Sequence, residues 1–186
     1  MPPKQAESAP WEKLCVDLIG PYTIINAHRK EILIHAVTMI DPATSWFELK
    51  LIPNKTALEV ANVVEQTWLT RYPWPQEITN DQGSEFMAEF ADMIENDYQI
   101  TKRPATTRNP QSNSIIERVH QTIGDMLRTF ELPKSEIEGS MALKGIFSVL
   151  MFAVHSTYHT MLKLCPCNLY LDAMQSWILN FRPIGT

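Results

Sequence analysis

The sequence predicts a single α/β domain with a mixed five-stranded sheet that is covered by helices on both faces. Three apolar, strand-like segments come first, helices then alternate with two short strands, and helices close the chain. At 186 residues the chain is long enough to bury a core, and its composition of 45% hydrophobic and 20% charged residues is ordinary for a globular protein. We expect residues 1–10 to form a flexible leader, 11–165 the core, and 166–186 a short helix with a truncated tail.

The first three strands are predicted from apolar runs that are bounded by turn residues. Residues 12–19 form the first strand, which Gly20-Pro21 should end. Residues 32–39 are almost continuously apolar, as expected of a central strand that is buried on both faces. Residues 46–52 form the third strand, after a turn at residues 41–45.

The rest of the chain is predicted to alternate between helices and two short strands. The helices span residues 55–71, 84–97, 117–131 and 136–162, with a short one after Pro166, and the strands span 77–79 and 99–102. Ser84 should cap the second of these helices, and Pro73 should end the first. The inward-facing residues of the long fourth helix should be Ile146, Val149, Leu150, Ala153 and Val154.

Cysteine usage and hydropathy exclude some classes of protein. The three cysteines predict no disulfide framework and no four-ligand zinc site, so we expect reduced, buried thiols of an intracellular protein. The longest stretch without charged residues, 145–162, is too polar for a membrane span. Trp46, Trp68 and Trp74 are expected in the core rather than as platforms for stacked bases.

Three acidic residues occupy positions that favour a metal site. Asp17 lies inside an apolar strand, where a charge is costly unless it is paired or bound to a metal. Asp81 follows the strand at 77–79, and Gly83 lets the chain turn there. Glu117 lies one turn into an amphipathic helix and faces away from the core; taken alone, it would be an ordinary solvated glutamate. Together the three acids suggest a carboxylate metal cluster.

The spacing of these acids matches a known signature. Between Asp81 and Glu117 lie 117 − 81 − 1 = 35 residues, with Asp-x-Gly-Ser-x-Phe at the first acid and Asn-Pro-Gln-x5-Glu at the second. The pattern resembles the D,D-35-E motif of retroviral and retrotransposon integrases, above all those of gypsy-class LTR retrotransposons. The resemblance covers residues 11–181. Within this range, it implies that residues 11–165 form the integrase catalytic core. Ser114 stands where related integrases commonly have Gly.

The resemblance implies a ribonuclease H-like fold and a defined chemistry. Asp17, Asp81 and Glu117 would be the catalytic residues and the ligands of two Mg²⁺ or Mn²⁺ ions, with Asp17 bridging both. The enzyme would be a polynucleotidyl transferase. Water would first cut the 3′ end of the element DNA, and the freed 3′-hydroxyl would then attack a host phosphodiester.

The resemblance also implies DNA and a second copy of the chain as partners. The residues expected to contact DNA are Asn109, Gln111, Asn113, Gln121, Arg118 and Arg128. Gln111 could equally serve only to form the turn, and His120 could equally be a surface histidine or a DNA contact. The net charge of −5 is unusual for a DNA binder. The acids, however, concentrate at residues 81–97, and basic residues gather around the loop and helix that follow. A homodimer or higher oligomer acting in the nucleus is expected.

Two other functions are compatible with the sequence. A catalytically degenerate remnant of a retroelement could keep the fold and only bind nucleic acid or protein, because the family's flanking domains are not expected in these residues. A ribonuclease H-like nuclease or a cut-and-paste transposase would share the metal chemistry. The Asn-Pro-Gln loop and the spacing of 35 residues favour an integrase over these nucleases.

Overall fold

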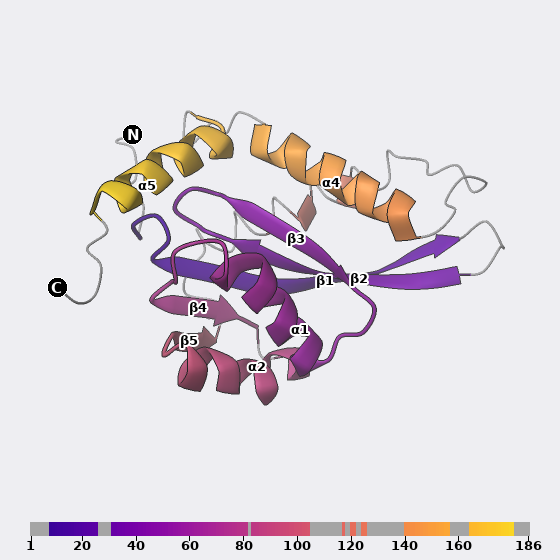
Figure 1. Cartoon of the computed structure of the whole chain (residues 1–186). Helices are drawn as coiled ribbons and strands as arrows, with labels where there is room; N and C mark the ends of the chain where they lie inside the picture. Colours follow the sequence, from indigo (N-terminus) through magenta and orange to yellow (C-terminus); the bar gives the residue numbers. More distant parts are fainter. Residues whose placement is uncertain are drawn as a thin grey trace.

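A mixed five-stranded sheet forms the centre of the molecule (Figure 1). The computed structural model describes residues 8–25, 31–81, 83–104, 117, 120–121, 124–125, 140–156 and 164–180. The strands are β1 (Lys13–Ile25), β2 (Glu31–Ile40), β3 (Phe47–Ile52), β4 (Glu77–Asn80) and β5 (Thr101–Pro104), in the order β3-β2-β1-β4-β5. β1, β2 and β3 pair antiparallel, whereas β1, β4 and β5 pair parallel. The predicted mixed sheet is confirmed.

Helices cover both faces of this sheet, as predicted, with α1 and α2 on one face and α4 and α5 on the other (Figure 1). The helices are α1 (Ala57–Val64), extended by a π-helical segment over Glu65–Leu69; α2 (Glu89–Asp92), extended likewise over Met93–Asp97; α4 (Ser140–Ser156); and α5 (Pro166–Asn180). Thr56 caps α1, because its hydroxyl accepts a hydrogen bond from the Glu59 amide at 3.2 Å. Among the described helices, none has the length and apolar character needed to cross a membrane.

The alternating side chains of β1 divide the core between the two faces of the sheet. Leu14 and Val16 join the larger cluster, which includes residues of α1 and α2. Cys15 and Ile19 join the smaller cluster, which includes residues of α4. This alternation places Asp17, between Cys15 and Ile19, on the α4 face of the sheet.

The first strand does not end at Gly20-Pro21, so this prediction is wrong. β1 continues to Ile25, and its pairing with β2 shifts register between Ile19 and Tyr22. Gly20 has a φ of 104°, which lies in a region that favours glycine, and Pro21 follows a cis peptide bond. Proline is tolerated at such a bulge because it has no N–H to give to the ladder.

The helices differ from their predictions in phase and continuity. On α4, Phe147 and Leu150 are buried while Val149 is 55% exposed, so Val149 was wrongly placed inward. The helix predicted at 84–97 is broken: a 3₁₀ turn spans Ser84–Phe86, and Ala88 has a φ of 46° before α2 starts. Ser84 therefore does not cap α2.

The last helix, α5, is longer than the short helix predicted after Pro166. It has 15 residues and contributes Ala173 to the larger core cluster, with Tyr170 and Met174 packed against it. An aromatic stack connects it to the sheet, because Trp46 lies between the rings of Tyr170 at 4.0 Å and His155 at 3.9 Å. The C-terminal helix is thus part of the packed domain.

The tryptophan prediction holds for two of the three residues. Trp68 is 1% exposed and contacts the rings of Trp11 and Tyr72, and Trp46 is packed against the larger cluster. Trp74, in contrast, is 60% exposed, and its indole N–H donates to the Leu69 carbonyl at 2.8 Å.

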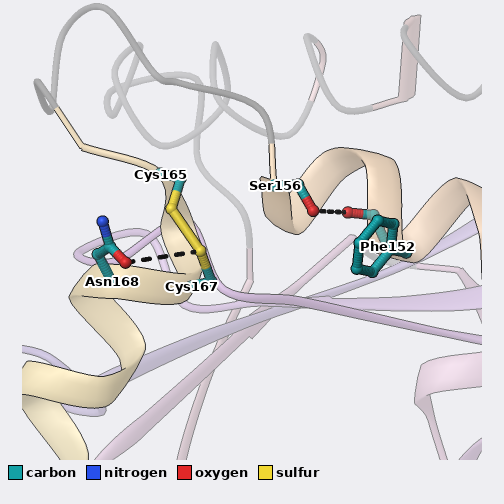
Figure 2. Close-up of a disulfide and its surroundings, with 5 residues drawn as sticks. All are labelled: Phe152, Ser156, Cys165, Cys167 and Asn168. Atoms are coloured by element: carbon teal, nitrogen blue, oxygen red, sulfur yellow. Dashed lines mark hydrogen bonds between the residues drawn. A yellow bond between two sulfur atoms is a disulfide. The ribbon is translucent and has the colours of Figure 1, made fainter.

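Two of the three cysteines form a disulfide, so the expectation of reduced thiols is wrong for them. Cys165 and Cys167 are bonded at the first turn of α5 (Figure 2), whereas Cys15 is a free, buried thiol as expected. Pro166 begins α5. The helical curvature that starts there places the two Cα atoms 5.4 Å apart, which is within the range that a disulfide requires.

Asp41 fixes the turn between β2 and β3, which leads to our first prediction. Its buried carboxylate accepts hydrogen bonds from the Ala43 amide at 2.9 Å, the Thr44 hydroxyl at 2.7 Å and the Trp11 amide at 3.2 Å. Replacing Asp41 with Ala leaves buried donors unpaired and should lower the free energy of unfolding by about 2–3 kcal/mol in a urea titration. The exposed Asp97→Ala is the control and should stay within about 0.5 kcal/mol of the wild type.

Candidate metal centre

Asp17 lies in the middle of β1, where its carboxylate is partly withdrawn from water. Its side chain is 34% exposed, and its Oδ1 accepts a hydrogen bond from the Leu18 amide at 2.8 Å. Burial raises the pKa of Asp17 above its ordinary value, and the negative charges of Asp81 and Glu85 raise it further. The strand therefore holds a carboxylate in a position that disfavours its charge.

Asp81 comes directly after β4, the parallel neighbour of β1, and its charge acts on Asp17. The last paired residues of the two strands are Cys15 and Thr79, so both acids follow this pair by two positions. The Gly83 amide donates to Asp81 Oδ1 at 3.0 Å, which orients this exposed carboxylate. Gly83 itself has a φ of −64°, so the turn does not require the left-handed conformation that we expected a glycine to provide.

A fourth acid, Glu85, joins this pair and was not predicted. Its charge acts on Asp17, and its carboxylate packs closely against Gly83. A Cβ atom at Gly83 would lie 2.8 Å from the carboxyl carbon of Glu85. The sequence gives no reason to single out Glu85, because it occupies the variable position of Asp-x-Gly-Ser-x-Phe.

Glu117 lies in a helical turn and is exposed, as predicted, with the exposed Gln121 one turn later. Within the described part of the chain, no three Asp, Glu, His or Cys side chains lie close enough together to hold a metal ion. The structure thus brings Asp17 near Asp81 and Glu85 but does not bring Glu117 into a closed three-acid site.

His120 faces the sheet rather than solvent, which differs from both of our expectations for it. Its Nδ1 lies 3.7 Å from Asp17 Oδ2, and its Nε2 lies 3.1 Å from the hydroxyl of Thr38. Thr38 is fully buried and is the cross-strand partner of Asp17. Burial lowers the pKa of His120 below its ordinary value, which favours the neutral ring.

The predicted DNA contacts can be placed only in part. Gln121 is exposed and helical, four residues after Glu117. Asn109, Gln111, Asn113, Arg118 and Arg128 lie outside the described residues. Of the nearby cations, Arg103 pairs with Glu77 at 3.2 Å, and Lys102 donates to the Phe86 carbonyl.

The chemistry of these side chains fits a hard divalent cation. All the acids contribute oxygen ligands, which Mg²⁺ and Mn²⁺ prefer. Burial is the main cause of the raised pKa of Asp17, and the charges of Asp81 and Glu85 add to it; a bound cation would stabilise the charged carboxylate against both. Asp17, Asp81 and Glu85 together provide the negative charge for such a cation.

The raised pKa of Asp17 leads to a prediction about stability. A folded state that binds the proton more tightly than the unfolded chain loses stability as pH rises from the unfolded pKa of about 4 through the raised pKa of the folded state. Asp17→Asn should therefore raise Tm at pH 7 without divalent cations, and this gain should vanish at a pH below both pKa values. Thermal unfolding followed by circular dichroism measures both; a lower Tm at pH 7 would contradict the prediction.

Comparison with known sequences finds distant relatives among retroviral and transposon polyproteins. No model of a protein family matches the chain. It is 23% identical over 120 residues to the retrovirus-related Pol polyprotein from transposon 412 of Drosophila melanogaster, covering 64% of this chain. It is 27% identical over 118 residues to the Gag-Pol polyprotein of Bovine immunodeficiency virus, covering 63% of this chain. The matches span only 9% and 8% of these polyproteins.

Comparison with solved structures identifies the fold. The catalytic core domain of BIV integrase superposes with a TM-score of 0.68 at 20% identity, covering 90% of this chain and 99% of that one. A chain of the simian T-cell lymphotropic virus intasome gives a TM-score of 0.69 at 13% identity, covering 95% of this chain and 57% of that one. The predicted ribonuclease H-like fold and the resemblance to retroviral-type integrase cores are confirmed.

Proposed function

We propose that this chain, whose fold is that of an integrase catalytic core, is a polynucleotidyl transferase that cuts and joins DNA during the integration of an LTR retrotransposon. The observation that carries the proposal is that Asp17 on β1 and Asp81, directly after the adjacent parallel strand β4, lie close enough for the charge of Asp81 to raise the pKa of Asp17. The distant Pol and Gag-Pol relatives support it.

Asp17, Asp81 and Glu117 are the residues that would hold two Mg²⁺ or Mn²⁺ ions. When bound, such ions activate the attacking oxygen and stabilise the leaving oxygen of an in-line displacement at phosphorus. The chain's own contribution is to hold the carboxylates in place. The Leu18 amide orients Asp17, and the Gly83 amide orients Asp81. The partial burial of Asp17 limits competition from water.

The substrates are the 3′ ends of element DNA and a target duplex. In the first reaction, water breaks a phosphodiester near the 3′ end and leaves a 3′-hydroxyl. In the second, this hydroxyl attacks a target phosphodiester, forming one P–O bond as another breaks. We assign DNA contact to the exposed Gln121, four residues after Glu117, and to Asn109, Gln111, Asn113, Arg118 and Arg128. The enzyme would act as an oligomer in the nucleus.

The alternative of a catalytically degenerate binding module is not favoured. Asp17, Asp81 and Glu117 are all present, and the neighbouring structures are an integrase catalytic core and an intasome. A nuclease that cleaves RNA–DNA hybrids would use the same acids, so substrate choice is what distinguishes it from an integrase.

Three labelled substrates separate these functions. The chain is incubated with Mn²⁺ and either a duplex with retroelement-type ends, the same duplex as an RNA–DNA hybrid, or single-stranded DNA. An integrase core should yield shortened strands and joined products longer than the substrate from the DNA duplex alone. Cleavage of the hybrid without joined products would instead identify a ribonuclease H-like nuclease. Binding to DNA without any cleavage would support the degenerate module.

A further inference from the structure

His120 connects the helix that carries Glu117 to the strand pair that carries Asp17. Each of its two ring nitrogens makes a contact: Nδ1 lies 3.7 Å from Asp17 Oδ2, and Nε2 lies 3.1 Å from Thr38 Oγ1. Thr38 Oγ1 also lies 3.2 Å from the backbone carbonyl of Asp17. One imidazole therefore meets both the side chain of Asp17 and its cross-strand partner.

The position of the ring hydrogen follows from these neighbours. The neutral ring has one N–H, and placing it on Nδ1 directs a donor toward the Asp17 carboxylate. With this tautomer, Nε2 competes as an acceptor with the Asp17 backbone carbonyl for the single hydrogen of the Thr38 hydroxyl. The opposite tautomer would set a nitrogen lone pair against a carboxylate. At 3.7 Å the Nδ1 contact is longer than a hydrogen bond, so it is an electrostatic attraction that favours one orientation of the carboxylate.

Because Thr38 and His120 are withdrawn from water, the contact between them restricts the position of the His120 ring. Thr38 is fully buried in the central strand β2, so its hydroxyl has a fixed position. The His120 side chain is 21% exposed and comes from the helical turn that follows Glu117. Holding His120 on Thr38 and Asp17 therefore also limits where the Glu117 helix can lie relative to Asp17.

We propose that His120 is a positioning residue of the metal centre, which orients Asp17 and docks the Glu117 helix on the β1–β2 pair. This inference rests on the proposed function. Groups that contact a metal-binding carboxylate typically alter metal affinity about 10–100-fold when they are removed, although they do not touch the metal.

Variants can distinguish the effect of the Nδ1 contact with Asp17 from that of the Nε2 contact with Thr38. His120→Ala removes both contacts. His120→Asn places an amide N–H where Nδ1 was and keeps the contact with Asp17, whereas His120→Gln places its amide near the position of Nε2 and keeps only the contact with Thr38. Thr38→Val removes the hydroxyl at nearly constant volume. His155→Ala is the matched control, because His155 is also partly buried but stacks on Trp46, away from the acids.

The experiment measures Mn²⁺ affinity by isothermal titration calorimetry, and Tm by circular dichroism, on the whole chain. His120→Ala should weaken Mn²⁺ binding about 10–100-fold, and His120→Asn should recover more of the affinity than His120→Gln. Thr38→Val should weaken binding too, and the effects of Thr38→Val and His120→Ala should not add, because both act through one contact. His155→Ala should lower Tm and leave Mn²⁺ affinity unchanged.

Two results would overturn the inference in different ways. If the wild type binds Mn²⁺ and His120→Ala binds it equally well while losing Tm, His120 only packs the helix, and the proposed function is unaffected. If the folded wild type binds no Mn²⁺, the proposed function fails, and the inference fails with it.

Discussion

Asp17→Asn and Asp81→Asn should each lower the rate of Mn²⁺-dependent DNA cleavage more than about a hundred-fold. Loss of a group that only supports a metal ligand already lowers activity about 10–100-fold, and these substitutions remove the ligands themselves. Both changes preserve side-chain volume, and Asn can still accept the hydrogen bonds from the Leu18 and Gly83 amides. The fold should therefore persist, and the loss should lie in the chemical step.

Glu89→Gln is the matched control for these two variants. Glu89 is an exposed acid at the start of α2, so neutralising it removes the same unit of charge without touching the site. Its cleavage rate should stay close to that of the wild type, measured on the same labelled duplex. Equal activity of Asp17→Asn, Asp81→Asn and the wild type would show that these acids are not the catalytic groups.

Trp68→Ala should produce the largest loss of stability, about 3–5 kcal/mol in urea unfolding. Its side chain is almost fully buried among α1-side core residues, and its ring lies 4.9 Å from that of Tyr72 and 6.1 Å from that of Trp11. Removing it leaves a cavity that the surrounding aromatic rings cannot fill. Because folded domains are stable by only about 5–15 kcal/mol, this variant should be near the limit of folding.

Trp74→Ala provides the matched control for this substitution. Trp74 is 60% exposed, with one edge contact to Tyr98 and one hydrogen bond to the Leu69 carbonyl. Its removal should cost about 1 kcal/mol, the net value of a typical hydrogen bond. A similar loss for both variants would mean that burial of Trp68 does not determine the stability of the core.

The strands and the placement of two acids could be predicted because hydrophobic patterning determines both. The almost continuous apolar run at residues 32–39 corresponds to β2, and the lone acid in the first apolar run corresponds to Asp17 in the middle of β1. Asp81 follows β4 as predicted, and its charge acts on Asp17 of the neighbouring parallel strand. Local sequence pattern was sufficient because each of these features lies within one strand or directly after it.

The errors arose where local patterns do not determine the outcome. Gly20-Pro21 is typical of a strand end, but the pairing with β2 continues past it through a bulge, which depends on the partner strand. On α4 the apolar residues surround the helix, so periodicity could not distinguish Phe147 from Val149 as the inward residue. The bond between Cys165 and Cys167 depends on chain curvature at Pro166, which cysteine spacing alone does not show.

The parts of the site that were missed depend on tertiary packing. Glu85 enters the site because a broken helix follows Asp81 and directs its side chain back toward Gly83. His120 contacts Asp17 and Thr38, which lie far from it in the sequence on β1 and β2. In the sequence, both residues are indistinguishable from ordinary polar residues of a helix surface.

The most direct test of the metal centre is a crystal structure of the chain grown with MnCl₂, in which anomalous scattering locates the ion. The account predicts Mn²⁺ bound by carboxylate oxygens of Asp17, Asp81 and Glu117, at roughly the 2.1 Å typical of small divalent cations. An ion held by Asp17, Asp81 and Glu85 with Glu117 still apart would contradict the assignment of the third acid. Absence of Mn²⁺ from Asp17 and Asp81 at saturating concentration would contradict the metal centre itself.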